Sequence, residues 1–471
     1  MNKSFVEHSQ QFQSGKDSPV NRLQKNLAMI ERRESEVKAF MTLADSDELM
    51  AQARASEARW QANTQLSPLD GATVAIKDII ETRDMPTGQG SPLWENFHSL
   101  RDSATVQALR AGGAIILGKT TSTEFAATEV YHATTNPNDP GRTPGGSSSG
   151  SAAAVASGMA TLALGSQVVG STLRPASFCG CVGFKPTFGA LNRGGTYDNL
   201  SQSCVGLFGR SITDVWALAQ MLASRVGGDP GHMPLQGPVS LPVARAPKRL
   251  VILQTDGWRV ADPASRKEFE AQVQKLRAAG VECVGREDNV LISAVEDAIK
   301  DVMQLTIRIT AWESLWPLGG YVAECPEKIS DAMHNRLAQA TKLTRADYVS
   351  DLKTRADIRA KYHELQESFD GVIALSATGV APVGLSVNGS PAMNVPASLL
   401  GVPALSLPEL SDQNLPLGLQ VIGWQGGDDV VFSLANWIQR LNRGKMTEPS
   451  PDRINSQFQT ATGNAGLTTI N

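Results

Sequence analysis

Glycine and serine residues concentrate in one stretch of this 471-residue chain, between Gly145 and Ser171. The stretch begins Gly-Gly-Ser-Ser-Ser-Gly-Ser and ends at Gly170-Ser171, with small apolar residues between. A serine hydroxyl is a weak nucleophile at neutral pH, so it needs a base and an oxyanion site. Upstream, Lys77 lies in an apolar, strand-like segment, where burial would lower its pKa and leave a neutral amine able to accept a proton. Together these residues predict acyl transfer by a serine that uses no histidine base.

Two other interpretations of these residues stay open at this stage. Lys77 could end a strand and extend its ammonium group to water, with Asp78 on the opposite face. A Ser-His-Asp triad is not eliminated by sequence alone, but no histidine lies in a Gly-x-Ser-x-Gly elbow. The histidines are His8, His98, His132, His232, His334 and His363.

The composition favours a packed intracellular protein. The chain is 41% hydrophobic and 19% charged with a formal net charge of −4, so we expect no nucleic-acid or membrane partner. Its polar N-terminus lacks a signal-peptide core, and no run of about 18 apolar residues occurs. An odd number of irregularly spaced cysteines favours reduced thiols in the cytoplasm, and no metal-binding spacing is present. The cysteines are Cys179, Cys181, Cys204, Cys283 and Cys325.

Helical and strand patterns alternate along the chain. Helices are expected over 20–61, 103–111, 151–157, 263–279 and 290–369. Strands are expected over 72–80, 114–117, 160–164, 249–253, 371–375, 404–407 and 415–423. This alternation predicts an α/β fold with one large mixed β-sheet flanked by helices on both faces.

Several segments, in this order, resemble the amidase signature family. Gly145 to Ala156 and Leu164 to Ser171 correspond to its central motif, and Cys179 to Thr187 corresponds to its closing segment. The spacing of Ser147 from Ser171 is also that of the family. Further similar segments are 74–78, 118–120, 136–144, 401–404 and 415–420.

The resemblance implies a Ser-Ser-Lys triad with no metal and no cofactor. Ser171 would be the nucleophile, Ser147 the proton relay and Lys77 the base, and a cis peptide would precede Ser147. Gly146 and Ser148 would contribute to the binding site around this relay. The backbone N–H groups of Val168, Val169, Gly170 and Ser171 would form the oxyanion loop.

This sequence departs from the family pattern inside that loop. Gln167 stands where many members have Asp, and Val169 stands where they usually have Gly. A β-branched residue tolerates positive φ badly, so we expect a negative φ at Val169 or a distorted loop. Arg174 is displaced by one position relative to the common motif.

The resemblance implies hydrolysis of an amide through an acyl-enzyme. Ser203 replaces the Asp with which glutamine-hydrolysing members bind the substrate ammonium, so a small uncharged carboxamide is favoured. Two alternatives are a glutamine-hydrolysing A subunit of an amidotransferase and a non-catalytic, amidase-like binding protein. Cys204 would line the pocket or fill the core. Three tryptophans would roof the pocket or simply pack: Trp94, Trp312 and Trp316.

We expect one amidase domain over residues 1–471. Helices within 1–65 would pack on this domain or on a second subunit, which leaves a homodimer open. Residues 226–370 would form a more variable, largely helical part around the pocket.

Overall fold

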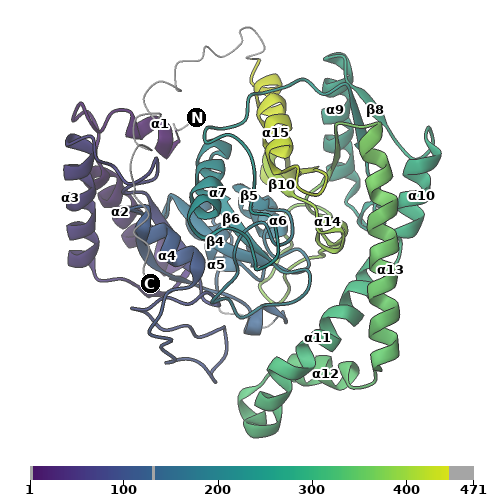
Figure 1. Cartoon of the computed structure of the whole chain (residues 1–471), viewed down its shortest axis with the longest axis horizontal. Helices are drawn as coiled ribbons and strands as arrows, with labels where there is room; N and C mark the ends of the chain where they lie inside the picture. Colours follow the sequence, from purple (N-terminus) through teal and green to yellow (C-terminus); the bar gives the residue numbers. More distant parts are fainter. Residues whose placement is uncertain (1–3, 130–132, 445–471) are drawn as a thin grey trace, which may run out of the picture.

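One mixed β-sheet organises the chain in this computed structural model, which describes residues 4–129 and 133–444 (Figure 1). The ends of the expected single domain, residues 1–3 and 445–471, lie outside the described residues, as does His132. Within the described part the sheet has 11 strands, in the order β1-β3-β2-β4-β6-β5-β10-β11-β9-β7-β8. The strands are β1 (Phe40–Leu43), β2 (Thr73–Lys77), β3 (Ile115–Thr120), β4 (Leu162–Gln167), β5 (Val182–Lys185), β6 (Cys204–Gly209), β7 (Arg249–Ile252), β8 (Glu282–Val284), β9 (Gly371–Leu375), β10 (Ala404–Asp412) and β11 (Leu415–Ile422).

The sheet contains two parallel groups of strands with an antiparallel middle, and its edge strand β1 is antiparallel to β3. Strands β3, β2 and β4 run parallel, as do β9, β7 and β8. From β4 through β6, β5, β10 and β11 to β9, neighbouring strands are antiparallel. The predicted mixed sheet is therefore confirmed, and strands from both halves of the sequence belong to it.

Helices cover both faces of the sheet (Figure 1). They are α1 (Phe5–Ser9), α2 (Pro19–Val37), α3 (Ser46–Gln61), α4 (Ala104–Ala111), α5 (Ser149–Ala156), α6 (Leu173–Cys179), α7 (Ile212–Val226), α8 (Asp256–Arg259), α9 (Pro263–Ala278), α10 (Val290–Ala298), α11 (Val302–Glu324), α12 (Asp331–Ala340), α13 (Arg345–His363), α14 (Val395–Leu400) and α15 (Asp428–Asn442). None of these described helices combines the length and the hydropathy that a transmembrane segment requires.

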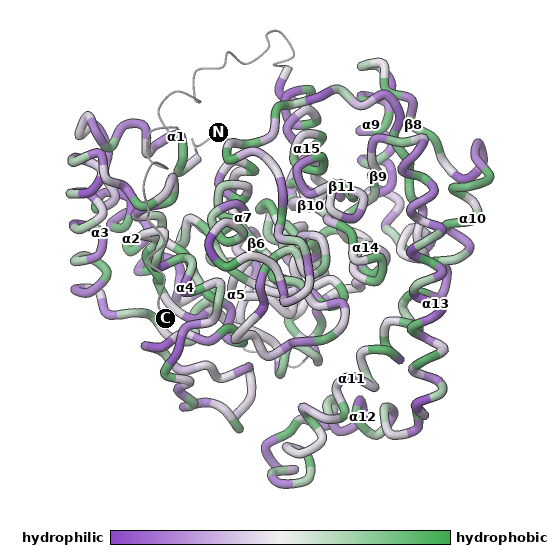
Figure 2. The backbone as a smooth tube through the Cα atoms, in the orientation of Figure 1, coloured by the Kyte–Doolittle hydropathy of each residue, from purple (hydrophilic) through white to green (hydrophobic). Residues whose placement is uncertain are grey.

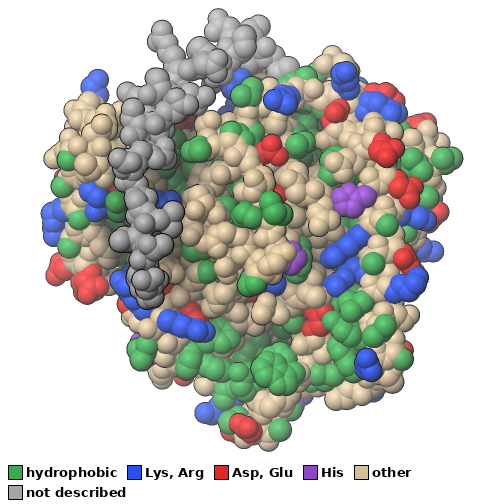
Figure 3. Space-filling view, in the orientation of Figure 1, with side chains coloured by type: hydrophobic (Ala, Val, Ile, Leu, Met, Phe, Trp, Pro, Cys, Tyr) green, Lys and Arg blue, Asp and Glu red, His purple; other side chains and the backbone are tan. Residues whose placement is uncertain are grey.

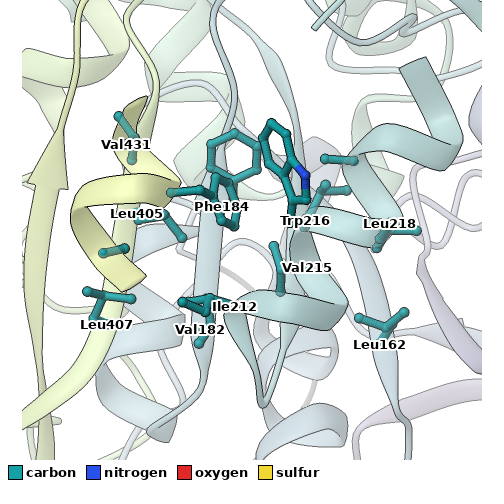
Figure 4. Packing of buried hydrophobic residues seen from close by; sticks show 14 of the residues in the cluster. Leu162, Val182, Phe184, Ile212, Val215, Trp216, Leu218, Leu405, Leu407 and Val431 are labelled. Atoms are coloured by element: carbon teal, nitrogen blue, oxygen red, sulfur yellow. The ribbon is translucent and has the colours of Figure 1, made fainter. Parts of the chain in front are cut away.

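Alternating strand residues bury both faces of the sheet. Val74 and Ile76 on β2 belong to a hydrophobic cluster with Trp216 of α7, part of which Figure 4 shows. Ala75, which lies between them, belongs to another cluster with Ala153 of α5. Successive side chains of a strand point to opposite faces, so this alternation requires a helix layer on each side. Lys77 shares the face of Ala75 and so points toward the layer that contains α5.

The helical pattern expected over 20–61 is confirmed by α2 and α3 but is wrong between them, where a strand lies. Helix α2 ends at Val37, its C-cap residue Lys38 has a φ of 53°, and the chain then forms the edge strand β1 against β3. The Glu34 carboxylate accepts hydrogen bonds from the backbone N–H groups of Ala39 and Phe40, which fixes the turn into β1. The apolar pattern over such a short segment resembles that of the flanking helices, which concealed the strand.

Helices α11, α12 and α13 form an arm beside the sheet, at the lower right of Figure 1. Contacts join α11 to both of the other helices. Figure 2 shows hydrophobic and hydrophilic positions alternating along α13, as expected of a helix with one packed and one solvated face. The stretch 226–370 is not wholly helical, because β7 and β8 within it extend the sheet.

Candidate active site

Lys77 lies at the carboxyl end of β2 and is fully buried, with 0% of its side chain surface exposed. Its Nζ donates hydrogen bonds to Ser147 Oγ at 2.7 Å and to Ser166 Oγ at 2.8 Å. Burial lowers the pKa of Lys77 to about 7, and the nearby Asp198 carboxylate opposes that shift. The interpretation in which Lys77 extends to water is therefore wrong, because the side chain ends among buried hydroxyl groups.

Ser147 lies just before α5, in the loop that carries the serine-rich stretch. The peptide between Gly146 and Ser147 is cis, as the resemblance implied. The Ser148 hydroxyl donates to the Ser166 carbonyl at 3.2 Å and accepts from the Ser166 N–H at 3.3 Å. Ser148 thus attaches this loop to β4 and places Ser147 beside Lys77.

Ser171 lies in the turn between β4 and α6, and 9% of its surface is exposed. Within the described part of the chain, no hydrogen bond joins its hydroxyl to another group. The structure therefore joins Lys77 and Ser147 directly, whereas the Ser171 hydroxyl makes no such bond to the described residues.

Arg174 joins the loops that carry the two serines. Its backbone N–H donates to the Gly170 carbonyl at 3.1 Å, and its Nη2 donates to the Gly146 carbonyl at 2.7 Å. Its Nη1 donates to the Gly389 carbonyl, and burial lowers the pKa of its guanidinium to about 10. From sequence Arg174 was only a displaced motif residue, and nothing local predicted this bridging role.

Gln167 makes three hydrogen bonds around residues 168–171, the predicted oxyanion loop. Its Oε1 accepts from the backbone N–H groups of Thr172 at 2.9 Å and Leu173 at 3.0 Å, at the beginning of α6. Its Nε2 donates to Ser398 Oγ at 2.9 Å, and that hydroxyl donates to the Val169 carbonyl at 2.8 Å. An aspartate could accept the first two bonds but could not donate the third.

The loop backbone keeps ordinary geometry despite Val169. Val169 is absent from the described residues with positive φ, so the expected negative φ is confirmed. The Val168 carbonyl accepts from Gln202 Nε2 at 2.8 Å. The carbonyls of both valines therefore have partners, which fixes the direction of the peptide groups that follow them.

A buried carboxylate that sequence reasoning missed also lies at this site. Asp198 is 6% exposed and precedes β6 in the loop after β5. Burial raises its pKa, while Lys77 and the hydroxyls of Ser166 and Ser203 oppose the rise. No motif marks Asp198, because its position depends on the path of a loop between two strands.

A cavity of about 480 Å³ lies beside the loop that carries Asp198. Its lining includes Ser201, Trp312, Trp316 and Tyr348. The rings of Trp312 and Tyr348 stack with centroids 5.6 Å apart, and Trp316 is 90% exposed. Figure 3 shows hydrophobic side chains gathered around a hollow in the lower part of the molecule, toward α11 and α12. Two of the three predicted tryptophans thus line a pocket.

The remaining sequence candidates, Trp94 and Cys204, do not line this cavity. Trp94 packs edge-on against Phe97, with ring centroids 4.5 Å apart. Cys204 is buried, and its Sγ lies 3.7 Å from Lys185 Nζ. A larger cavity of about 630 Å³, between α1, α2 and the beginning of α7, is lined by none of the residues predicted from sequence.

The sheet, the paired serine loops and the buried lysine define an α/β enzyme that acts on amides. Residues 22–432 match the family model Amidase, and the chain belongs to this family of C–N hydrolases. The A subunit of glutamyl-tRNA(Gln) amidotransferase from Cyanothece sp. is 32% identical over 471 residues, which cover 92% of this chain and 96% of that protein.

Two solved structures are also similar over most of their length. One is a crystal structure of an amidase, with a TM-score of 0.79 and 26% identity, covering 93% of this chain and 99% of its own. Another comes from a vestigial protein complex that reveals the evolutionary origins of an s-triazine catabolic enzyme. It has a TM-score of 0.80 and 28% identity, and covers 93% of this chain and 98% of its own.

Proposed function

We propose that this protein hydrolyses a small uncharged carboxamide to a carboxylate and ammonia or an amine, through an acyl-enzyme on Ser171. The observation that carries the proposal is the hydrogen bond from buried Lys77 to Ser147, made by an amine whose pKa is lowered to about 7. A general base works best when its pKa lies near the operating pH.

The reaction proceeds in two halves. Ser171 Oγ attacks the amide carbon while its proton passes to Ser147, whose own proton passes to neutral Lys77. The C–N bond then breaks, and the leaving nitrogen takes a proton back along the same chain. Water attacks the resulting ester with the same relay, which releases the carboxylate and restores Ser171.

The negative oxygen that forms in each half would be stabilised by N–H groups of Val168, Val169, Gly170 and Ser171. Such donors act best when they are held rigid before the reaction. Support comes from the bonds that Gln202 and Ser398 make to the carbonyls of this loop, at 2.8 Å each. Gly146 and Ser148 would shape the wall opposite the loop.

An uncharged substrate is favoured because the charged side chains described near the cavity are paired with other groups of the protein. The Glu313 carboxylate accepts from the Ser201 N–H at 2.9 Å and from the Tyr348 hydroxyl at 2.8 Å. Arg193 pairs with Asp229 at 2.6 Å. These described charges are already satisfied within the protein, and a substrate ammonium or carboxylate would have to compete with those partners.

The second candidate is the A subunit of a glutamine-dependent amidotransferase, favoured by the 32% identity to a protein of that kind. That function predicts ammonia release from glutamine only when partner subunits are added. Ammonia release from simple carboxamides by the purified chain alone would support the first candidate instead.

The test uses purified protein, a panel of short aliphatic, aryl and ureido amides with ammonia detection, and a fluorophosphonate that labels active serines. Ser171→Ala should abolish turnover and labelling, and Lys77→Ala should abolish turnover with the fold intact. Ser147→Ala should slow turnover by several orders of magnitude.

Ser157→Ala is the matched control. The hydroxyl of this buried serine donates to the Ala153 and Ala154 carbonyls of the preceding helix turn, away from the proposed reaction. Absence of labelling in the wild type would favour a non-catalytic binding protein.

A further inference from the structure

An uncovered tryptophan ring lies at the cavity of about 480 Å³. Trp316 lines this cavity and is 90% exposed, and no other large hydrophobic side chain in the described part of the chain is as exposed. A single exposed apolar side chain is common on protein surfaces, but a group of them beside a hollow marks a binding site. The other residues that line the cavity therefore decide what Trp316 does.

Two further aromatic rings line the same cavity. Trp312 precedes Trp316 by one turn of α11, so both side chains lie on the same side of this helix. The Trp312 ring stacks on Tyr348 of α13, with centroids 5.6 Å apart and planes inclined by 18°. Leu200 is the sole aliphatic side chain among the described residues of the lining. The apolar surface of the cavity is thus mostly aromatic, which favours a flat ring as its occupant.

The polar groups at the base of the cavity bond to one another. The Glu313 carboxylate accepts from the Ser201 N–H and hydroxyl and from the Tyr348 hydroxyl. Arg355 Nη1 donates to Ser201 Oγ at 2.7 Å. These bonds attach α11 and α13 to the loop that carries Ser201, so the aromatic wall is held in place. They also occupy the polar groups, which leaves the rings as the contact surface for a ligand.

The same loop is attached to the predicted oxyanion loop. Gln202, which follows Ser201, donates through Nε2 to the Val168 carbonyl at 2.8 Å. Strand β6 then begins at Cys204, which pairs with Gln167 of β4. The cavity therefore adjoins the segment that leads into Ser171. Its volume lies within the range usual for sites that bind small molecules.

We propose that this cavity binds an aromatic ring of the amide substrate and that Trp316 is the specificity-determining residue, its indole stacking on that ring. The inference rests on the proposed function, because it assigns a substrate class, amides that bear an aryl group, to the same site. The stacked pair of Trp312 and Tyr348 forms the fixed part of the wall, and the substrate ring covers the exposed face of Trp316.

The experiment compares kcat/KM for amides with and without a ring, in the wild type and in Trp316→Ala. Phenylacetamide carries the ring on the acyl side and N-benzylacetamide on the amine side, and acetamide and N-methylacetamide are their ringless counterparts. For at least one pair, the ratio of phenyl to ringless kcat/KM should fall about tenfold in Trp316→Ala, the size expected for loss of one aromatic contact. The pair that responds identifies the part of the substrate in the cavity. Trp316→Phe keeps a ring and should keep this ratio within about threefold of the wild type.

Val290→Ala is the control, because Val290 is 83% exposed at the beginning of α10 and does not line the cavity. It should leave both ratios unmoved. A purely structural role of Trp316 would lower kcat/KM equally for phenyl and ringless amides. Ratios that stay unmoved in Trp316→Ala, for either reason, would overturn the inference.

Binding to Ser171→Ala tests the inference separately from catalysis. Calorimetry with the two phenyl amides should give a dissociation constant about tenfold larger when Trp316→Ala is added to Ser171→Ala. If the wild type hydrolyses no amide, the proposed function fails and this measurement alone decides the inference. Absence of binding, or equal dissociation constants with and without the indole, would then overturn it.

Discussion

Replacing Lys77 with methionine should stabilise the protein at neutral pH, although it removes the proposed base. The folded chain lowers the pKa of this amine from 10.5 to about 7 because it is buried. At about 1.4 kcal/mol for each pKa unit, this difference costs the folded state about 4–5 kcal/mol at pH 7. A methionine of similar length removes the cost.

Two losses reduce the gain. The variant gives up hydrogen bonds to Ser147 and Ser166, worth about 1 kcal/mol each. The net stabilisation at pH 7 should therefore be about 2 kcal/mol.

The sign of the pH dependence follows from proton binding. Between pH 7 and 10.5 the unfolded chain holds a proton on this lysine and the folded chain does not, so wild-type stability rises with pH through that window. At pH 10.5 and above the penalty has disappeared, and the variant should be about 2 kcal/mol less stable than the wild type.

Urea unfolding of the wild type and Lys77→Met at pH 7, 8.5 and 10 measures the difference between their free energies of unfolding. Titrating groups that the two proteins share contribute equally to both and cancel in this difference. Lys353→Met is the control, because it makes the same substitution at a side chain that is 77% exposed. A constant difference for Lys77→Met across the same range would show that the buried amine is not neutral in the folded protein.

Three further predictions concern activity. Turnover should fall about tenfold for each pH unit below about 7, because only neutral Lys77 accepts a proton, and a flat profile from pH 5 to 8 contradicts this. Gln167→Asp and Ser398→Ala should each slow turnover about tenfold, since each breaks the series of hydrogen bonds from Gln167 through Ser398 to the Val169 carbonyl. Their double variant should be no slower than either one, and additive losses would argue against a shared chain. Arg174→Lys should slow labelling of Ser171 at least tenfold, because a single ammonium cannot replace a guanidinium that reaches two carbonyls. Wild-type labelling in that variant would show that the two loops hold their positions without it.

The apolar segments around Lys77 and the ordered serine motifs were sufficient to predict the α/β sheet and the family. Strand β1 was missed because its four residues lie between two helices and pair with β3, which is distant in sequence. Local patterns carry little information about such an edge strand, whose pairing depends on partners outside the segment.

The sequence by itself determined which side chains are available for the chemistry: two serines, one lysine in an apolar strand, and a loop altered at Gln167 and Val169. Only the tertiary structure decided how those groups are coupled. It buries Lys77 and joins it by hydrogen bonds to Ser147 and Ser166, which lie in two separate segments of the chain. It also places Asp198, from a later loop, where its negative charge opposes the fall in the pKa of the lysine. Burial and charge pairing arise between segments that meet only in the folded chain, and these two effects set the pKa of the proposed base.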